Sequence, residues 1–364
     1  MYILKNLKIL IFYLLYSKVK EIISAKKSPN VKHFRTVLKK KYQYSIFEIK
    51  NSILYNASVH DCAIISENKL VKEASYQFRH SKKKDVVNGK PSENITFKVG
   101  TPKIRKNIPA TVFSMLTGGA GKNNYFHWLF DVLPRIAILE NYKNKKKPDY
   151  YLVPSLKYPF QKETLKKMNI PISKILDGEK NKHLFCDKLF VVDHPYVFKN
   201  NPTKSILNIP EWIIKWLQTT FRVSNKKKNY HPLKIFIDRS DSPMAKTRYL
   251  INDKDIKSTL KDLGFKIVTL SNFSFSDQIK IFKNANIIVG LHGAGFANII
   301  FSKAKTKIVE IQSSTSGNVI RNLAKKCNLK YKKISIKSKN KNLTNQHGNI
   351  YVDINKLKKS ILSN

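Results

Sequence analysis

Three of the chain's twelve glycines lie within GLHGAGFANIIF, residues 290–301. The apolar residues before the loop predict a buried strand, and those after it predict a short helix. The first N–H groups of a helix lack partners within it and carry partial positive charge, so they bind phosphate readily. Gly293, Ala294 and Gly295 would let a pyrophosphate approach the backbone, and His292 could donate a hydrogen bond to it. Taken alone, the loop fits a tight turn with a structural histidine better.

Two arginines and a glutamate strengthen the phosphate interpretation. Only eight of the 69 basic residues are arginine, yet Arg239 lies at the end of a predicted strand and Arg248 lies just before the next predicted helix. Guanidinium groups match phosphate oxygens in shape and charge. Glu310 ends a later predicted strand, where a carboxylate could accept hydrogen bonds from ribose hydroxyls, although a plain surface carboxylate is the alternative. Together with the loop, these residues predict a nucleoside diphosphate site.

A second chemically useful pair lies in the first half, within NYFHWLFDVLPR, residues 124–135. His127 and Asp131 are four residues apart, so a helix would place them on one face. An unperturbed histidine titrates near neutral pH, and a neighbouring carboxylate could orient it and raise its basicity. This combination suits a general base. The alternative is a buried aromatic helix in which the two side chains merely satisfy each other.

The second half has the pattern that would position the phosphate site. Apolar runs of strand length alternate with amphipathic helical segments. The predicted strands are 233–239, 265–270, 286–290 and 306–312, and the predicted helices are 253–264, closed by Gly264, 274–285 and 317–328. Such an alternation is typical of a Rossmann-like unit, in which ligands bind at the carboxyl ends of the strands. The glycine loop therefore lies where these folds bind ligands.

The first half is less regular. Apolar runs at 149–154 and 188–193, with a helical pattern at 159–169 between them, predict an α/β domain with a parallel sheet. Residues 31–110 have the pattern of short strands and loops. The best linker candidate is 224–232. We therefore divide the chain into a basic N-terminal helix at 1–30, a first domain at 31–223 and a second domain, which contains the predicted diphosphate site, at 224–364.

The formal net charge of +45 ordinarily points to nucleic acid or an anionic membrane. Lysine, asparagine and isoleucine are raised together throughout the chain, as an AT-rich genome would produce, and the arginines do not cluster as base readout favours. We therefore expect no nucleic-acid partner, with a basic nucleic-acid-binding protein kept as an alternative. Cys62, Cys186 and Cys327 are too few and too far apart for a disulfide framework or a CxxC metal site, which fits a reducing cytoplasm.

The N-terminal segment 1–30 is both basic and apolar. Its apolar core, Ile9 to Tyr16, is shorter than the about 20 residues that span a bilayer, and no A-x-A cleavage site follows it. Lysines at 5, 8, 18, 20, 26 and 27 around leucine, isoleucine and aromatic residues are typical of an interfacial anchor on anionic lipid. A helix docked on the protein is an equal alternative. We expect a cytoplasmic protein that, with an anchor, is peripheral on the inner face of the cytoplasmic membrane.

Several motifs together resemble glycosyltransferase family 61, which includes bacterial capsular-polysaccharide enzymes. They are GGAGKNNYFHWLFDVLPRIAIL in the first half and RSDSPMAKTRYLIN, FSFSDQIKIFKNANIIVGLHGAGFANIIF and IVEI in the second, across about residues 111–312. The resemblance implies a GT-B fold, in which two Rossmann-like α/β domains face a cleft. It also implies inverting transfer of a hexosyl or pentosyl group from a nucleotide sugar to a glycan, in surface or capsular polysaccharide synthesis. A non-catalytic nucleotide-sugar-binding protein is the alternative.

The resemblance makes 31–223 the acceptor-side domain and 224–364 the nucleotide-sugar donor domain, and it assigns residues to each side of the reaction. The expected donor-binding residues are Arg239, Arg248, His292, Gly293, Ala294, Gly295, Asn298 and Glu310. Because the donor half supplies the phosphate site, the base should come from the other domain, with His127 the first candidate and Asp131 the second. Residues expected on the acceptor side are Tyr125, Trp128 and Arg135, although Trp128 equally fits a core position. The expected partners are a nucleotide-sugar donor and a glycan or lipid-linked glycan acceptor.

The resemblance implies catalysis without a cofactor and without a metal-binding DxD motif. A literal DxD does occur at Asp253–Asp255. We interpret it as the start of a helix with Asn252 or Asp253 as its N-cap. The arginines and the helix terminus could stabilise the departing diphosphate without a metal ion.

Overall fold

The structure is a computed structural model that describes residues 2–82, 85–116, 120–142, 147–197, 201–223, 232–242, 248–338 and 348–363, without the side chains of Tyr2, Ile3, Lys5 and Ala120. The chain divides into two compact units, Met1–Leu217 and Gln218–Asn364. This division falls inside helix α7, Glu211–Thr220. The linker predicted at 224–232 lies outside the described residues except for Pro232, and the sequence-based boundary at 223 stays a prediction.

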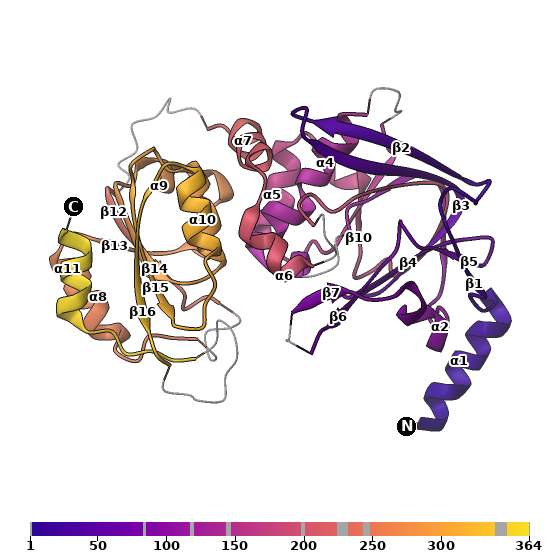
Figure 1. Ribbon diagram of the computed structural model, residues 1–364, viewed down its shortest axis with the longest axis horizontal. Coiled ribbons are helices and arrows are strands. Elements are labelled where there is room, and N and C mark those ends of the chain that lie inside the picture. The colour runs from indigo at the N-terminus through magenta and orange to yellow at the C-terminus, as the bar shows by residue number, and fades with distance from the viewer. Residues whose placement is uncertain are drawn as a thin grey trace. The chain divides into compact units, whose positions relative to one another are not determined.

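The second unit contains a five-stranded parallel sheet (Figure 1). Its strands are β12 (Lys234–Asp238), β13 (Lys266–Thr269), β14 (Ile287–Leu291), β15 (Lys307–Ser313) and β16 (Lys330–Ile336). They lie in the order β13-β12-β14-β15-β16, so the strand order reverses at the neighbours β12 and β14. Open parallel sheets bind ligands at such a switch point, beyond the carboxyl ends of the strands. The alternation predicted for this half is confirmed.

Helices cover both faces of the parallel sheet. They are α8 (Asp253–Asp262), η7 (Leu270–Asn272), α9 (Phe275–Asn284), η8 (Ala294–Phe301), α10 (Val319–Lys326) and α11 (Ile354–Leu362). Figure 1 shows α8 and α11 on one face, and α9 and α10 on the other. Strands covered on both faces need apolar side chains on both, and Ile288 and Val289, neighbours in β14, are each fully buried.

Helix α8 begins as predicted, with Asn252 at its N-cap position, but the side chain of Asn252 makes no capping hydrogen bond. Asn252 precedes the helix, but its side-chain amide donates to Val352 O (2.8 Å) and accepts from Val352 N (3.0 Å). It therefore ties α8 to the chain before α11 instead of capping α8. Asp253 pairs with Lys257 one turn later (2.7 Å), which supports the first turn of the helix. Gly264, at φ +78, follows the end of α8 as predicted.

The first unit contains a mixed sheet of eleven strands. They are β1 (Glu21–Ile23), β2 (Val31–Leu38), β3 (Tyr42–Ser58), β4 (Asp61–Ser66), β5 (Lys69–Val71), β6 (Tyr76–His80), β7 (Val86–Asn88), β8 (Lys106–Ser114), β9 (Tyr150–Val153), β10 (Ile175–Asp177) and β11 (His183–Val192). Strands β8 to β11 form the expected parallel part. On its other side β11 pairs with β3 antiparallel. A purely parallel Rossmann-like sheet in this half is therefore wrong.

The cause of this difference lies in the first hundred residues. The sequence predicts short strands there, but β3 is 17 residues long and pairs antiparallel with both β2 and β4. Short turns join these strands, and hairpins require antiparallel pairing. The apolar face of β3 is buried in the same core as β8 and β11, as Ile49, Val112 and Leu189 show. The hairpins thus extend the parallel part into one mixed sheet.

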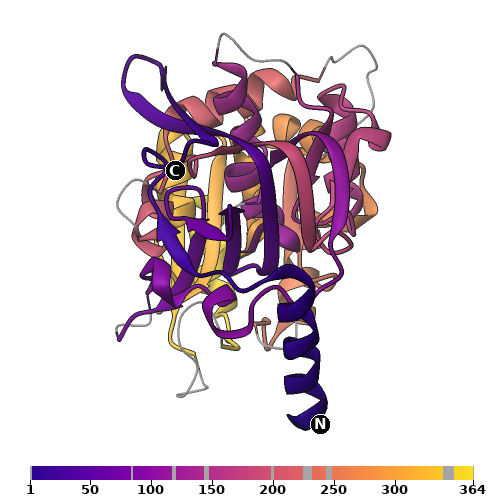
Figure 2. The same ribbon diagram turned by 90° about the vertical axis from the view of Figure 1, so that its right-hand side faces the viewer.

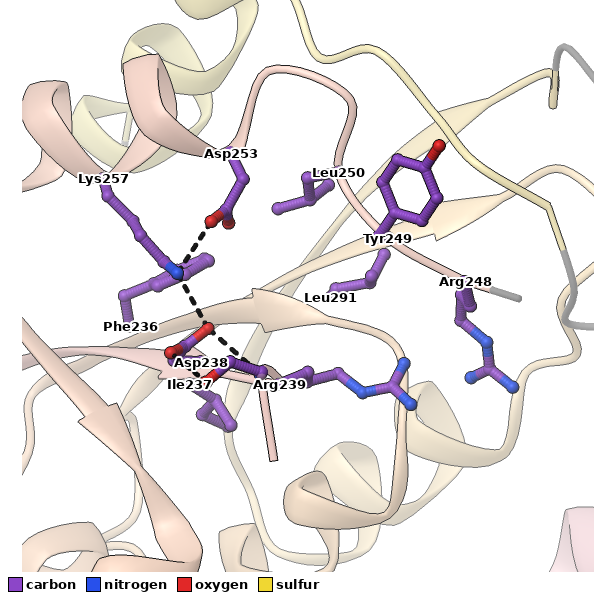
Figure 3. A pocket seen from close by; sticks show the side chains of 11 residues that line it. Phe236, Ile237, Asp238, Arg239, Arg248, Tyr249, Leu250, Asp253, Lys257 and Leu291 are labelled. Atoms are coloured by element: carbon purple, nitrogen blue, oxygen red, sulfur yellow. Dashed lines mark hydrogen bonds and ion pairs between the residues drawn. The ribbon is translucent and has the colours of Figure 1, made fainter. Parts of the chain in front are cut away.

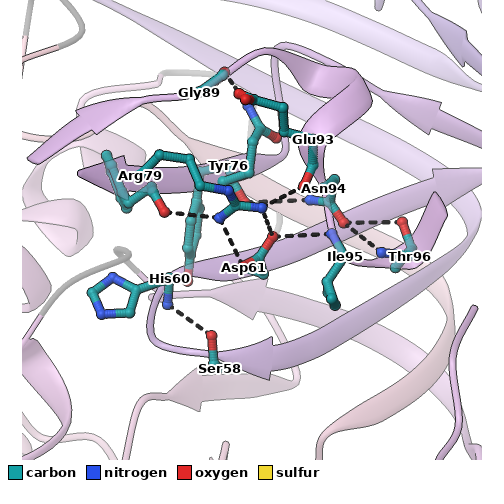
Figure 4. Close-up of polar contacts among 12 residues, drawn as sticks. Ser58, His60, Asp61, Tyr76, Arg79, Gly89, Glu93, Asn94, Ile95 and Thr96 are labelled. Atoms are coloured by element: carbon teal, nitrogen blue, oxygen red, sulfur yellow. Dashed lines mark hydrogen bonds and ion pairs between the residues drawn. The ribbon is translucent and has the colours of Figure 1, made fainter. Parts of the chain in front are cut away.

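An ion pair holds the edge of this mixed sheet together (Figure 4). Arg79 in β6 donates two hydrogen bonds to Asp61 in β4, each 2.9 Å long. The same guanidinium group donates to the backbone carbonyl of Glu93, and Asp61 also accepts from Ile95 N (3.0 Å). The Asp61 hydrogen bond, opposed by burial, raises the pKa of Arg79. These contacts fix the turn before α2 (Thr96–Val99) on strands β4 and β6.

The remaining helical segments of the first unit are short, apart from α1. They are α1 (Tyr2–Tyr16), η1 (Pro91–Glu93), η2 (Ala120–Lys122), α3 (Tyr125–His127), the π-helical turn η3 (Trp128–Val132), α4 (Pro134–Glu140), α5 (Pro159–Lys167), η4 (Ile172–Lys174), α6 (Pro202–Ser205) and η5 (Ile206–Asn208). Among the residues that the structure describes, no helix is both long enough and apolar enough to cross a membrane.

Candidate active site

The histidine and aspartate of the first unit lie on a helical segment with a π-turn. Asn124 begins this segment, because its side chain accepts hydrogen bonds from Phe126 N (2.9 Å) and His127 N (3.4 Å). A bond from Leu133 N to Trp128 O (3.1 Å) then closes the wider turn of η3. Such π-turns are frequent at functional sites. The helix on which the sequence analysis relied to bring His127 and Asp131 to one face is thus present, and its π-turn is a feature that the apolar pattern does not reveal.

His127 and Asp131 form the hydrogen-bonded pair that their spacing predicts. His127 Nδ1 lies 2.8 Å from Asp131 Oδ2. The histidine side chain is 25% exposed, whereas the aspartate side chain is 3% exposed. The pair therefore has one solvent-facing member, His127, and a buried member that orients it. With Nδ1 bonded to Asp131, the nitrogen through which His127 would take a proton is Nε2.

Two further residues contact Asp131 that the sequence analysis did not identify. Tyr196 donates its O–H to Asp131 Oδ1 (2.6 Å), and His194 Nε2 lies 3.6 Å from Asp131 Oδ2. Because Tyr196 N donates to His194 Nδ1 (3.3 Å), a neutral His194 carries its proton on Nε2 and directs it at Asp131. Both residues come just after β11, at the end of the strand predicted at 188–193. Polar side chains at such a strand end are the sequence feature that could have identified them.

These contacts determine which of His127, Asp131 and His194 carry a proton. Burial lowers the pKa of His127, but the charge and hydrogen bond of Asp131 raise it by more, so the net pKa lies above 6.5. Burial raises the pKa of Asp131, yet His127 and His194 hold it far below its usual range. The pKa of His194 is lowered by burial, with Arg135 and His127 adding to this effect. Asp131 is therefore an anion that tunes His127, and His194 favours its neutral form.

The three residues expected on the acceptor side have different surroundings. Trp128 is fully buried and donates to Thr164 Oγ1 (2.9 Å), so it belongs to the core. Arg135 is 4% exposed and donates to Val192 O (2.9 Å), and burial lowers its pKa to about 10. These positions suit structural roles, and an acceptor-side role for Trp128 or Arg135 stays a prediction. Tyr125 is half-buried and lies edge-on to Phe160, and its contact with an acceptor stays a prediction.

In the second unit, Arg239 and Arg248 converge on one backbone carbonyl. Figure 3 shows the two arginine side chains beside the pocket described below. Arg239 Nη1 donates to His292 O at 2.6 Å, and Arg248 Nη1 donates to the same oxygen at 2.8 Å. Arg239 follows β12 and His292 follows β14, so the contacts join the two strand ends at the switch point. Both arginines are predicted near the glycine loop from their places in the sequence, whereas the carbonyl that brings them together is visible only in the structure.

Because the guanidinium groups of Arg239 and Arg248 share one acceptor, their positive charges lie close together and repel each other. Burial lowers the pKa of Arg239, which Asp241 partly opposes. Burial and the charge of Arg239 together lower the pKa of Arg248 to about 10. Arg248 is only 8% exposed. An anion bound between the two guanidinium groups would relieve both effects, because it would replace lost solvation and offset the repulsion.

The glycines of the loop make room for protein groups. A Cβ at Gly293 would lie 2.9 Å from Arg239 Cζ and Nε, and one at Gly295 would lie 2.8 Å from Leu270 Cδ1. Gly293 has φ 167, which is extended backbone open to any residue, so its need for glycine is spatial. The glycine density therefore has an intramolecular explanation, and the approach of a pyrophosphate to Gly293, Ala294 and Gly295 stays a prediction.

His292, Glu310 and Tyr331 form a chain of hydrogen bonds behind the loop. Glu310 is fully buried, and one of its oxygens bonds to His292 Nδ1 while the other accepts the O–H of Tyr331. A ligand contact by His292 would therefore use Nε2. Both oxygens of Glu310 already have protein partners, which suits the residue to orienting His292. A contact between Glu310 and a ribose stays a prediction.

Asn298 is also placed in the interior. Its side chain is fully buried and donates to Gln278 Oε1 (3.0 Å), and Gln278 in turn donates to the carbonyls of Leu270 and Phe273. Through these bonds Asn298 fixes η8 against α9. This position suits a structural role, and a donor contact by Asn298 stays a prediction.

A pocket of about 240 Å³ opens beside the arginines at the end of β12. Its lining comprises Phe236, Ile237, Asp238, Arg239, Ser240, Arg248, Tyr249, Leu250, Asp253, Lys257 and Leu291. Figure 3 shows Lys257 between two carboxylates, Asp238 at 2.9 Å and Asp253 at 2.7 Å. The pocket thus combines a doubly cationic end with an ion-paired end. Within the described parts of the chain, no group of three or more His, Cys, Asp or Glu side chains is arranged to hold a metal ion.

Comparison with known proteins covers His127, Asp131, Arg239, Arg248 and His292 with one family match. The family model Glycosyltransferase 61 matches residues 125–309, just over half of the 364-residue chain. Alpha-1,3-arabinosyltransferase XAT3 of Oryza sativa subsp. japonica is 25% identical over 264 residues, which cover 66% of this chain and 43% of that protein. The chain thus spans less than half the length of this relative. By its family match, the chain belongs to glycosyltransferase family 61.

Proposed function

We propose that the protein is an inverting glycosyltransferase that moves a sugar from a nucleotide-sugar donor to a glycan or lipid-linked glycan acceptor. The observation that carries this proposal is the convergence of Arg239 and Arg248 on His292 O at the switch point of a parallel sheet. Two guanidinium groups at a sheet's ligand-binding edge suit a diphosphate. The family match, which spans both arginines, supports the same reaction class.

In the proposed reaction, Nε2 of His127 takes up the proton of the acceptor hydroxyl. The acceptor oxygen then attacks the anomeric carbon on the side opposite the diphosphate, and the bond between that carbon and the phosphate oxygen breaks. The electron pair stays on the diphosphate, whose charge Arg239 and Arg248 stabilise. Asp131 holds the imidazole through Nδ1 and stabilises the imidazolium that forms.

The contacts favour His127 over Asp131 as the base. Asp131 is buried and bonded to Tyr196 and His127, and its pKa is far below its usual range, chiefly because His127 outweighs the effect of burial. So weak a base would take up an acceptor proton poorly near neutral pH. His127 is more exposed, and Asp131 raises its pKa against the effect of burial, which makes it a stronger base than Asp131.

The finer features of the resemblance belong to this proposal. They are a GT-B arrangement of the two units around a common site, a cytoplasmic location, a role in bacterial surface or capsular polysaccharide synthesis, and catalysis without a metal ion. The similar plant protein is named an arabinosyltransferase, so pentose donors belong beside hexose donors among the candidates.

A panel of UDP-, GDP-, CMP- and dTDP-sugars, with pentose and hexose forms of each, tests the proposal. We expect one nucleotide class to raise the melting temperature, since a ligand of the folded state stabilises it, and the matching sugar nucleotide to be consumed on incubation. Binding without consumption, with any acceptor offered, would instead favour the non-catalytic nucleotide-sugar-binding alternative. Consumption should continue in EDTA. Loss of turnover in EDTA with rescue by Mn²⁺ would refute metal independence.

A further inference from the structure

Helix α1 is held to the first unit by two tyrosines near its C-terminal end. Tyr13 donates its O–H to Lys98 O (3.2 Å) and packs against Gly100, where a side chain would collide with the tyrosine ring. Tyr16 accepts a hydrogen bond from Arg105 N (3.0 Å), and its ring lies edge-on to His183 with 4.9 Å between centroids. The helix is thus docked at one end, and Figure 2 shows the rest extending away from the sheet.

The face of α1 opposite the tyrosines is apolar and exposed. Leu4 is 71% exposed, Leu7 51%, Ile11 46% and Leu14 81%. At about 100° per residue these four positions fall on one side of the helix, roughly opposite Tyr13 and Tyr16. A continuous row of large exposed apolar side chains marks a surface that another body covers.

The surrounding charge determines what kind of body fits. Residues 1–47 contain eleven lysines and arginines but a single acidic residue, Glu21, which is already paired with Lys69 (2.9 Å). Lys8, Lys18 and Lys20 are exposed. A second copy of this helix would bring like charges together, whereas a surface of anionic lipid headgroups would match both the apolar row and the positive charge around it.

We propose that α1 lies in the surface of a membrane that contains anionic lipid, with Leu4, Leu7, Ile11 and Leu14 in the apolar layer. Lys8, Lys18 and Lys20 contact the headgroups. The two interpretations of the N-terminal segment are then both partly right, because one face of the helix docks on the protein and the other on lipid. This surface takes no part in the transfer reaction, so it can be tested on its own.

Flotation of the full chain with vesicles tests this proposal. We expect the protein to float with vesicles of mixed phosphatidylcholine and phosphatidylglycerol, and much less with phosphatidylcholine alone. The triple variant Leu7→Gln, Ile11→Gln, Leu14→Gln keeps the charge and a good helix former at each position. Its affinity for the mixed vesicles should fall roughly tenfold or more, because three apolar groups leave the lipid.

A matched control places the same changes on exposed apolar residues elsewhere. Ile172, Leu207 and Leu233 are 60%, 37% and 53% exposed, and their replacement by Gln should leave flotation unchanged. A second triple variant, Lys8→Gln, Lys18→Gln, Lys20→Gln, should weaken binding to the mixed vesicles and reduce its dependence on salt. The equivalent changes at Lys254, Lys261 and Lys266, all exposed, remove the same charge and should have little effect.

Four results would overturn the proposal. The first is the absence of flotation with the mixed vesicles, and the second is equal flotation with both kinds of vesicle. The third is equal flotation of the wild type and the variant Leu7→Gln, Ile11→Gln, Leu14→Gln with the mixed vesicles. The fourth is a dimer in solution that this variant alone abolishes, without vesicle binding, which would make a second copy the occupant. Thermal unfolding by circular dichroism confirms that each variant is folded.

Discussion

The guanidinium group of Arg239 lies directly against the backbone of Gly293, where a Cβ would be 2.9 Å from both Cζ and Nε of the arginine. A side chain at this position would therefore displace the guanidinium group of Arg239. Because Arg239 also donates to His292 O, the two residues together set the position of one of the two positive charges proposed to hold the donor.

Gly293→Ala should therefore weaken donor binding while the fold is retained. At φ 167 alanine meets no backbone strain, so the added methyl group acts by displacing the Arg239 side chain. Nucleotide affinity by calorimetry should fall, with a small change in melting temperature. Gly295→Ala is the matched control, because its methyl group would press on Leu270 and should lower stability more than affinity. The reverse ranking would contradict this account.

Replacing Arg239 or Arg248 by alanine should weaken nucleoside diphosphate binding by about 1.5 to 3 kcal/mol, the range for hydrogen bonds to charged groups. Each variant removes one of the two groups that converge on His292 O. Arg321→Ala removes an exposed arginine of α10 and is the control with the same change of charge. Unchanged affinity in both site variants would refute the diphosphate site.

His127→Ala should reduce turnover about a hundredfold or more, the usual contribution of a general base. Donor affinity should stay near the wild-type value, because the proposed donor contacts belong to the second unit. His127→Gln keeps a side chain of similar size with hydrogen-bonding groups but no basic nitrogen, so it should be almost as inactive. A folded His127→Ala protein with wild-type turnover would leave the base to Asp131 or another residue.

Changes at Asp131 and Tyr196 should shift the acidic limb of the pH–rate profile in opposite directions. The limb follows the pKa of His127, which must be unprotonated to act, and Asp131 raises that pKa above 6.5 against the effect of burial. Asp131→Asn removes the charge, so the limb should move to lower pH. Tyr196→Phe removes a hydrogen bond from Asp131 and strengthens its pull on His127, so the limb should move to higher pH.

A purely structural role would give a different pattern for this pair of variants. Both would then lower turnover or stability without opposite shifts in pH dependence. Shifts in the same direction, or an Asp131→Asn variant that is less active than His127→Ala, would contradict the assignment of Asp131 as the positioning residue. The measurement is kcat/KM for the donor across pH, which reports groups of the free enzyme.

The parts of the structure that the sequence predicted are those set by local spacing. The strands and helices of the second unit follow strong apolar periodicity. The His127–Asp131 contact follows from four-residue spacing in one helix and survives the π-turn that begins at Trp128. In both cases, neighbouring residues alone determine the geometry.

The parts that were missed depend on segments far apart in the chain. Tyr196 reaches Asp131 across 65 residues, and Arg239 reaches His292 O across 53. Such contacts depend on which strand ends meet, and a single sequence does not reveal strand order. The antiparallel pairing of β11 with β3 was missed for the same reason. An apolar run has the same sequence pattern whether its strand pairs with a parallel or an antiparallel neighbour.

The configuration of the transferred sugar tests the central claim most directly. Nuclear magnetic resonance of the reaction with the donor found in the nucleotide-sugar panel would follow the anomeric proton from donor to first product, with His127→Ala run in parallel. We predict a product of inverted configuration that the wild type forms and the variant forms at about a hundredth of the rate or less. A product of retained configuration, or equal rates for the two proteins, would contradict inverting transfer with His127 as the base.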